Sequence, residues 1–119
     1  YTADTVAIGT SAGGTSQSLS CIAIGKLAGN LNQGSGESSA IAIGYKAGYS
    51  DQRWLTISIG YKAGASTQGG QAIALGVEAG RTDQNAAAIA IGVSAGNHQQ
   101  GQTAVAIGEI AGAENQGQN

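Results

Sequence analysis

The chain has 119 residues, of which 21 are Gly and none is Pro, Met or Phe, and only 10% are charged. This composition is unlike that of an ordinary globular domain. The formal net charge of −2, without any run of Lys or Arg, argues against nucleic acid and anionic membrane surfaces as partners. No apolar run approaches the roughly 20 residues of a membrane-spanning helix, so we expect no nucleic-acid partner and no membrane insertion by this segment.

One short phrase recurs along the chain. In its third copy, at residues 41–48, it reads IAIGYKAG. The first glycines of its copies are Gly9, Gly25, Gly44, Gly60, Gly76, Gly92 and Gly108. Successive first glycines are 16 residues apart, except for one interval of 19 residues between the second and third copies. A fixed period of this length predicts a stack of identical structural units.

The longer interval contains the only irregularity, a run of Gly, Ser and Glu. We expect a surface loop insertion at about 34–39, pushed out of one unit without interrupting the stack. Copies three to seven then follow at a constant period. Residues 1–119 are therefore expected to form a single β-solenoid segment, a fragment of a longer repeat array.

Strand, rather than helix, fits each unit. Every copy contains two or three glycines, each costing about 1 kcal/mol in a helix, and no stripe of period 3.6 is present. The apolar-Ala-apolar triplets suit a strand, because side chains alternate between its faces and β-branched residues favour it. The predicted fold class is all-β: a parallel β-solenoid of seven coils of 16 residues, about 34 Å long at about 4.8 Å per coil.

The apolar residues of the triplets are expected to form the structural core. They are Ile22, Ile24, Ile41, Ile43, Ile57, Ile59, Ile73, Leu75, Ile89, Ile91, Val105 and Ile107. Two such side chains per coil make a thin core for 16 ordered residues, even with backbone hydrogen bonds to both neighbouring coils. Because a lone chain is marginal on this balance, we expect oligomerisation. The residues between the apolar pairs would be the oligomer interface: Ala23, Ala42, Ser58, Ala74, Ala90 and Ala106.

A glutamine stands four residues after the second glycine of every copy. These residues are Gln17, Gln33, Gln52, Gln68, Gln84, Gln100 and Gln116. Amide groups stacked at coil spacing can donate hydrogen bonds to one another, as in other stacked β structures. We therefore expect a glutamine ladder, because a buried amide without such partners would be costly.

The sequence gives little support for a catalytic site or a metal-binding site. His98 is the only histidine and occupies a variable column, so no Ser, His and Asp constellation can be assembled around it. Asp51 and Asp83 share a column whose other members are not acidic, unlike the Asp-bearing calcium repeats of other solenoids. We expect no enzyme activity, no cofactor and no metal.

Aromatic and basic residues gather in the third and fourth copies. A possible surface recognition site is formed by Tyr45, Tyr49, Tyr61, Trp54, Lys46 and Lys62. Aromatic side chains with basic neighbours on a rigid face can bind a protein or a glycan. The alternative is that these side chains only cover apolar surface at the edge of a coil.

The phrase VAIGTSA at residues 6–12 and its later copies resemble the head repeats of trimeric autotransporter adhesins, the YadA-like family, with a longer 16-residue period here. The resemblance implies a left-handed parallel β-roll, a homotrimer, and an extracellular or cell-surface segment that adheres to a host surface protein or glycan. The segment would carry the adhesive surface, or hold a binding tip away from the surface. Similar repeats suit a phage or large-virus fibre, which would place the segment on a virion surface. An ice-binding β-solenoid is a second alternative, although it requires a regular rank of Thr that no column provides.

Overall fold

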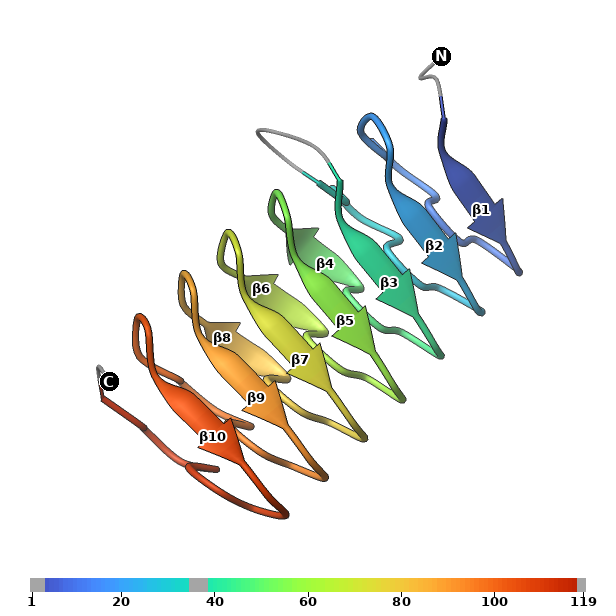
Figure 1. The fold of residues 1–119 in the computed structure, drawn as a ribbon. Coiled ribbons are helices and arrows are strands. Elements are labelled where there is room, and N and C mark those ends of the chain that lie inside the picture. The colour runs from blue at the N-terminus through green and yellow to red at the C-terminus, as the bar shows by residue number, and fades with distance from the viewer. Residues whose placement is uncertain (1–3, 35–38, 118–119) are drawn as a thin grey trace.

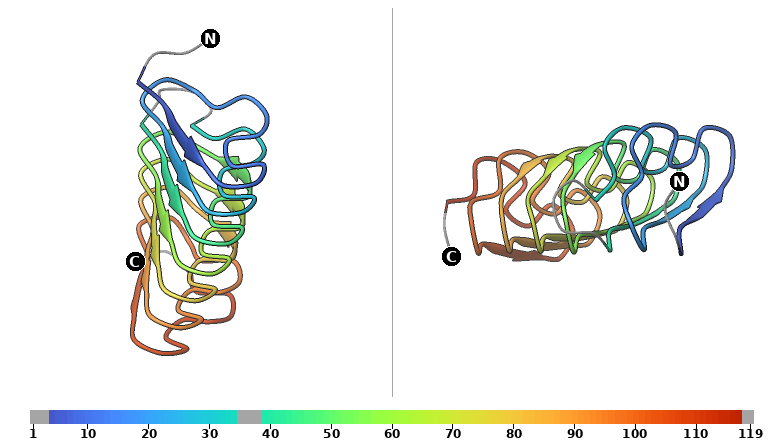
Figure 2. Two further views of the ribbon diagram at one scale, coloured as in Figure 1. Left: turned by 90° about the vertical axis from the view of Figure 1, so that its right-hand side faces the viewer. Right: turned by 90° about the horizontal axis from the view of Figure 1, so that it is seen from above.

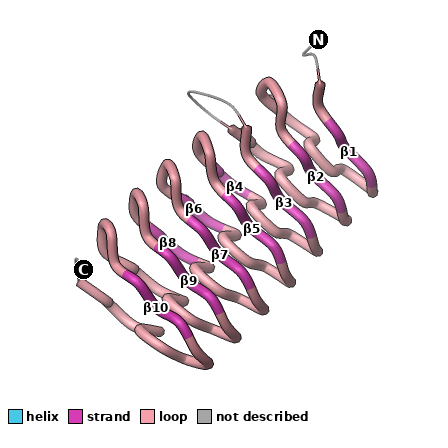
Figure 3. The backbone as a smooth tube through the Cα atoms, in the orientation of Figure 1, coloured by secondary structure: helices cyan, strands magenta, loops and turns pink. Residues whose placement is uncertain are grey.

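The computed structural model describes residues 4–34 and 39–117. In these residues the chain is all β, without a helix. The strands are β1 (Val6–Ile8), β2 (Ile22–Ile24), β3 (Ile41–Ile43), β4 (Ser50–Gln52), β5 (Ile57–Ile59), β6 (Ser66–Gln68), β7 (Ile73–Leu75), β8 (Thr82–Gln84), β9 (Ile89–Ile91) and β10 (Val105–Ile107). Turns and loops make up most of each coil, and the three-residue strands occupy its two flat sides (Figure 3).

The strands form a parallel β-solenoid of about six turns, which confirms the predicted fold (Figure 1). One sheet has seven strands in the order β1-β2-β3-β5-β7-β9-β10, and the other has the order β4-β6-β8. Single β-bridges at Thr15, Leu31, His98 and Glu114 continue the smaller sheet into the outer coils. The principal extents are 38 × 24 × 15 Å, close to the length predicted for the stack.

The winding of the coil is left-handed. In Figure 1 the strands of the larger sheet lie in front and run toward the lower right, and β4, β6 and β8 run behind them toward the upper left. The chain meanwhile advances from upper right to lower left, which is the left-handed sense. The turned views in Figure 2 show the same two sheets on opposite sides of one elongated stack.

Equivalent residues of successive copies lie on top of one another. Ile41 pairs with Ile57, and Ala42 with Ser58, so the repeat and the strand register coincide. The same register continues across the longer interval, where Ile22 pairs with Ile41. Of the loop insertion predicted at about 34–39, residues 35–38 lie outside the described residues, so that prediction remains untested.

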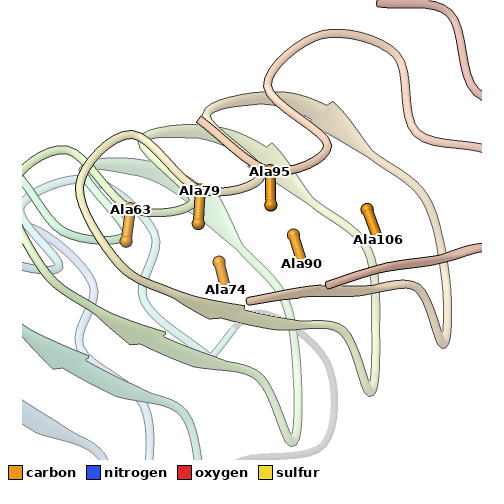
Figure 4. Close-up of a cluster of buried hydrophobic side chains, with 6 residues drawn as sticks. All are labelled: Ala63, Ala74, Ala79, Ala90, Ala95 and Ala106. Atoms are coloured by element: carbon orange, nitrogen blue, oxygen red, sulfur yellow. The ribbon is translucent and has the colours of Figure 1, made fainter. Parts of the chain in front are cut away.

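The interior of the coil is lined by alanine, and the predicted core of larger apolar residues is wrong. Ala63, Ala79 and Ala95, from one side of the coil, face Ala74, Ala90 and Ala106 from the larger sheet (Figure 4). The residues predicted as core instead point outward and are half-buried or exposed: Ile22, Ile24, Ile41, Ile43, Ile57, Ile59, Ile73, Leu75, Ile89, Ile91, Val105 and Ile107.

The physical reason is the small width of the coil. A Cβ atom built on Gly96 would lie 3.2 Å from the Cβ of Ala90 and 2.6 Å from the Oε1 of Gln100. Methyl groups and one amide therefore fill the space between the two sheets, and an isoleucine side chain would not fit. Interiors packed to crystal-like density do not yield to an added branched side chain without backbone movement.

The predicted oligomer interface is wrong for the same reason. Its members are all 0–2% exposed within the single chain: Ala23, Ala42, Ser58, Ala74, Ala90 and Ala106. Side chains enclosed by their own coil cannot contact a second chain. The opposite face of the larger sheet carries aliphatic side chains that are half-buried or exposed, so it remains available for a contact between copies.

Left-handed backbone conformations at non-glycine residues bend the chain at several points of each coil, one of them within the smaller sheet. In the coil that leads from β3 to β5 they occur at Lys46 (φ 54), Asp51 (φ 55) and Leu55 (φ 54). The first glycine of each copy takes a still less accessible angle, as at Gly44 (φ 126). A Cβ there would meet the carbonyl oxygen of Gly60 at 2.7 Å, so glycine permits the close approach of successive coils.

Candidate interaction surfaces

The outward face of the seven-stranded sheet carries two ranks of aliphatic side chains, and we call it the outer sheet face. The first rank is Val6, Ile22, Ile41, Ile57, Ile73, Ile89 and Val105. The second rank is Ile8, Ile24, Ile43, Ile59, Leu75, Ile91 and Ile107. Near the middle of the stack Ile59 is 38% exposed, and at its end Ile107 is 64% exposed.

This face is a continuous apolar strip. Seven strands at about 4.8 Å spacing extend over about 30 Å, and every outward residue in them is Ile, Val or Leu. Monomeric soluble proteins rarely expose contiguous apolar patches larger than a few hundred Å². The outer sheet face therefore has the character of a contact surface.

The glutamine ladder is confirmed along much of the stack. Amide groups donate from Nε2 to the Oε1 of the next coil between Gln17 and Gln33 (3.0 Å), and along the run from Gln52 through Gln68 and Gln84 to Gln100 (3.1–3.3 Å). The Nε2 of Gln116, in the last coil, donates to the carbonyl of Val105.

Each amide also crosses its own coil. The Nε2 of Gln84, for example, donates to the carbonyls of Ile73 (2.8 Å) and Ala88 (3.2 Å). The Oε1 of Gln52 has no partner among the described residues, and the longer interval of the repeat directly precedes this coil. The second glycine of each copy makes room for the amide: a Cβ on Gly80 would lie 2.5 Å from the Oε1 of Gln84.

Tyrosine and lysine side chains cluster where the chain turns from the larger sheet to the smaller one, and we call this cluster the Tyr–Lys corner. The rings of Tyr45 and Tyr61 stack with centroids 5.4 Å apart and planes 18° apart. The Nζ of Lys46 lies 5.6 Å from the centroid of Tyr45 and 5.5 Å from that of Tyr49. The Nζ of Lys62 lies 5.1 Å from the centroid of Tyr61.

Backbone hydrogen bonds between coils hold this corner rigid. The amide of Lys62 donates to the carbonyl of Tyr45 (2.8 Å), and that of Lys46 donates to the carbonyl of Lys26 (3.1 Å). Five of the six residues predicted for surface recognition are thus brought together. The sixth, Trp54, lies at the other corner of its coil, where its ring packs over Gly70.

Chemical groups elsewhere are scattered. The Nδ1 of His98 lies 3.4 Å from a carboxylate oxygen of Glu114, and both side chains are solvent-exposed. A shallow depression near the C-terminal end is lined by Asn85, Ala86 and Gln102 with two glycines. Within the described ranges, no three His, Cys, Asp or Glu side chains are grouped to hold a metal ion. Those ranges also contain no helix that could span a bilayer.

Comparisons of the chain with protein-family models, with curated proteins and with solved structures found no match.

Proposed function

We propose that this segment is part of a homotrimeric extracellular fibre or adhesin head, and that the outer sheet face is the contact between its copies. The observation that carries the proposal is the continuous double rank of aliphatic side chains on a sheet whose other face is already filled by its own coil. The resemblance to trimeric autotransporter head repeats supplies the number of chains.

The energy of such a contact is substantial. Full burial of an Ile or Val side chain contributes about 1.5–3 kcal/mol, and the outward side chains retain enough exposure to contribute on the order of 0.5–1 kcal/mol each. With two such side chains on each of seven strands, the gain is on the order of 10 kcal/mol per chain. Three chains related by an axis parallel to the stack would bury all of these ranks at once.

The proposed role is mechanical and adhesive. Three stacks side by side make a rod that holds a binding tip away from a surface, or that binds a host surface protein or glycan along its length. Every lateral site would occur three times, which raises avidity without strong individual contacts. A phage or large-virus fibre would use the same rod, and a virion-attachment domain beside this segment would favour that source over a membrane-anchored adhesin.

The test is a pair of lysine substitutions on opposite faces. Ile59→Lys places an ammonium group in the centre of the outer sheet face, where burying it against apolar surface costs several kcal/mol per chain. Ser66→Lys places the same group on the exposed side of the smaller sheet. Native mass spectrometry should find trimers for the unmodified chain and for Ser66→Lys, and single chains for Ile59→Lys.

Circular dichroism of both variants provides the control for folding. Because Ile59 is 38% exposed in the single chain, a lysine there can reach water and the coil itself should persist. Equal trimer content in the two variants would contradict the assignment of the interface.

A further inference from the structure

The Tyr–Lys corner concentrates positive charge on a chain whose net charge is negative. Of the five Lys and Arg residues, four lie in this turn of successive coils: Lys26, Lys46, Lys62 and Arg81. Two acidic residues share the turn. Glu78 pairs with Arg81 at 3.3 Å, and Glu109 lies in the last coil. The unpaired basic residues of this turn therefore lie in coils two to four. In the next coil the acidic Glu78 is paired with Arg81.

We propose that the Tyr–Lys corner binds a linear polysaccharide that carries carboxylate or sulfate groups. The ammonium groups of Lys46 and Lys62 would bind the anionic groups, and the phenol hydroxyls of Tyr45 and Tyr61 would hydrogen-bond to sugar hydroxyls. This inference rests on the proposed function, because it names the class of partner for a lateral site on the rod.

The spacing of the corner suits an extended chain. Equivalent side chains recur at about 4.8 Å along the stack, and the backbone bonds between coils fix their positions. A ligand running parallel to the stack would meet Lys46 and Lys62 one coil apart, with Lys26 in the adjacent column of the preceding coil. A rigid, pre-organised row loses little conformational entropy on binding.

The arrangement of the rings favours a saccharide over nucleic acid. Bases bind to such proteins by stacking on free aromatic faces. Here Tyr45 and Tyr61 stack on each other, and an ammonium group lies over each ring. Since both rings are engaged in this way, we infer that they contribute mainly through their exposed outer edges. Tyr45 is 36% exposed and Tyr61 is 45% exposed.

The lysines of the corner lie beyond the outer sheet face. Tyr45 and Tyr61 follow Ile43 and Ile59 by two residues, so they lie at the margin of the outer sheet face. Lys46 and Lys62 lie one residue further around the turn, and Tyr49 directly precedes the smaller sheet. Contact between copies across the larger sheet does not require Lys46, Lys62 or Tyr49.

The experiment measures binding of the folded protein to immobilised heparin, polygalacturonate, neutral dextran and a single-stranded oligothymidylate. We expect binding to at least one of the two anionic polysaccharides and none to dextran. Comparison of heparin with polygalacturonate separates sulfate recognition from carboxylate recognition. The double variant Lys46→Gln/Lys62→Gln should weaken that binding about tenfold, at roughly threefold for each exposed charge. Arg53→Gln removes one charge at the other corner and should leave binding unchanged.

A second variant tests the hydroxyl groups. Tyr45→Phe/Tyr61→Phe keeps the stacked rings but removes both hydroxyls, and should weaken polysaccharide binding severalfold. The inference would be overturned by failure to bind either anionic polysaccharide, by equal weakening in Arg53→Gln and the double lysine variant, by unchanged binding in the double phenylalanine variant, or by tighter binding of the oligothymidylate.

Native mass measured on the same samples separates this inference from the proposed assembly. Trimers that bind no polysaccharide would refute the inference and leave the assembly standing. Single chains that bind with the expected pattern would refute the assembly and leave the inference standing.

Discussion

Replacing a central glutamine of the ladder should be among the most damaging single changes to the stack. Gln84 is 1% exposed. Its Nε2 lies within hydrogen-bond distance of the carbonyls of Ile73 and Ala88 and of the Oε1 of Gln100, which share its two hydrogens, and its own Oε1 accepts from Gln68. Gln84→Leu keeps a side chain of comparable size but removes all of these hydrogen bonds.

The expected cost follows from the groups left behind. The Oε1 of Gln100 is buried and would lose its donor, and each buried polar group without a partner costs about 1–3 kcal/mol. Together with the lost bonds to the two carbonyls, we expect a loss of about 3 kcal/mol. For a chain of this size that corresponds to a fall in melting temperature of roughly 10 °C.

Thermal unfolding followed by circular dichroism is the assay, with all variants at one protein concentration because assembly makes melting concentration-dependent. The matched control is Gln102→Leu, which changes an exposed glutamine at a corner of the neighbouring coil. Equal melting temperatures for Gln84→Leu and Gln102→Leu would refute the role of the buried amides.

Two further predictions concern the backbone. Thr67 has a left-handed conformation (φ 52) that disfavours β-branched residues and tolerates Asn. Thr67→Asn should therefore raise the free energy of unfolding in urea by about 0.5–1 kcal/mol, whereas Thr15→Asn, without a left-handed backbone, should not. Gly92→Ala would place a Cβ 2.8 Å from the carbonyl oxygen of Gly108, while Gly108→Ala at a similar φ meets nothing closer than 4.0 Å. Gly92→Ala should lower the melting temperature more than Gly108→Ala, and equal losses would show that stacking between coils contributes nothing at this position.

The repeat predicted the stack well, because a stack has only one way of placing equivalent residues. The 16-residue period correctly gave the parallel pairing of Ile41 with Ile57 and the alignment of glutamines from coil to coil. It also placed Tyr45 and Tyr61 in one exposed column. These features depend on sequence spacing alone and not on the direction in which a strand faces.

The repeat spacing could not decide which face of each strand points into the coil. Alternation along Ile89-Ala90-Ile91 shows that the isoleucines share one face, but either face satisfies the alternation. The general tendency of large apolar residues to lie inside pointed to the wrong face, since the coil is too narrow to hold them. A signal was present in the columns: the inward positions accept only small residues such as Ala90 and Ser58, whereas the outward positions vary among Ile, Val and Leu.

Trp54 shows a second limit of predicting the recognition site from the sequence. Its proximity in sequence to Tyr45 and Tyr49 suggested one recognition site, yet half a coil of chain places it at the opposite corner. In a solenoid, residues one full period apart are neighbours and residues half a period apart lie on opposite sides. Grouping of candidate residues by column, rather than by distance along the chain, would have separated Trp54 from the tyrosines.

The mass of the unmodified protein in solution tests the central claim most directly, namely that the outward aliphatic ranks are covered by sister chains. Native mass spectrometry or sedimentation at micromolar concentration should give three times the 11.6 kDa of one chain. A folded species of 11.6 kDa, with its double rank of Ile, Val and Leu in contact with water, would contradict the account.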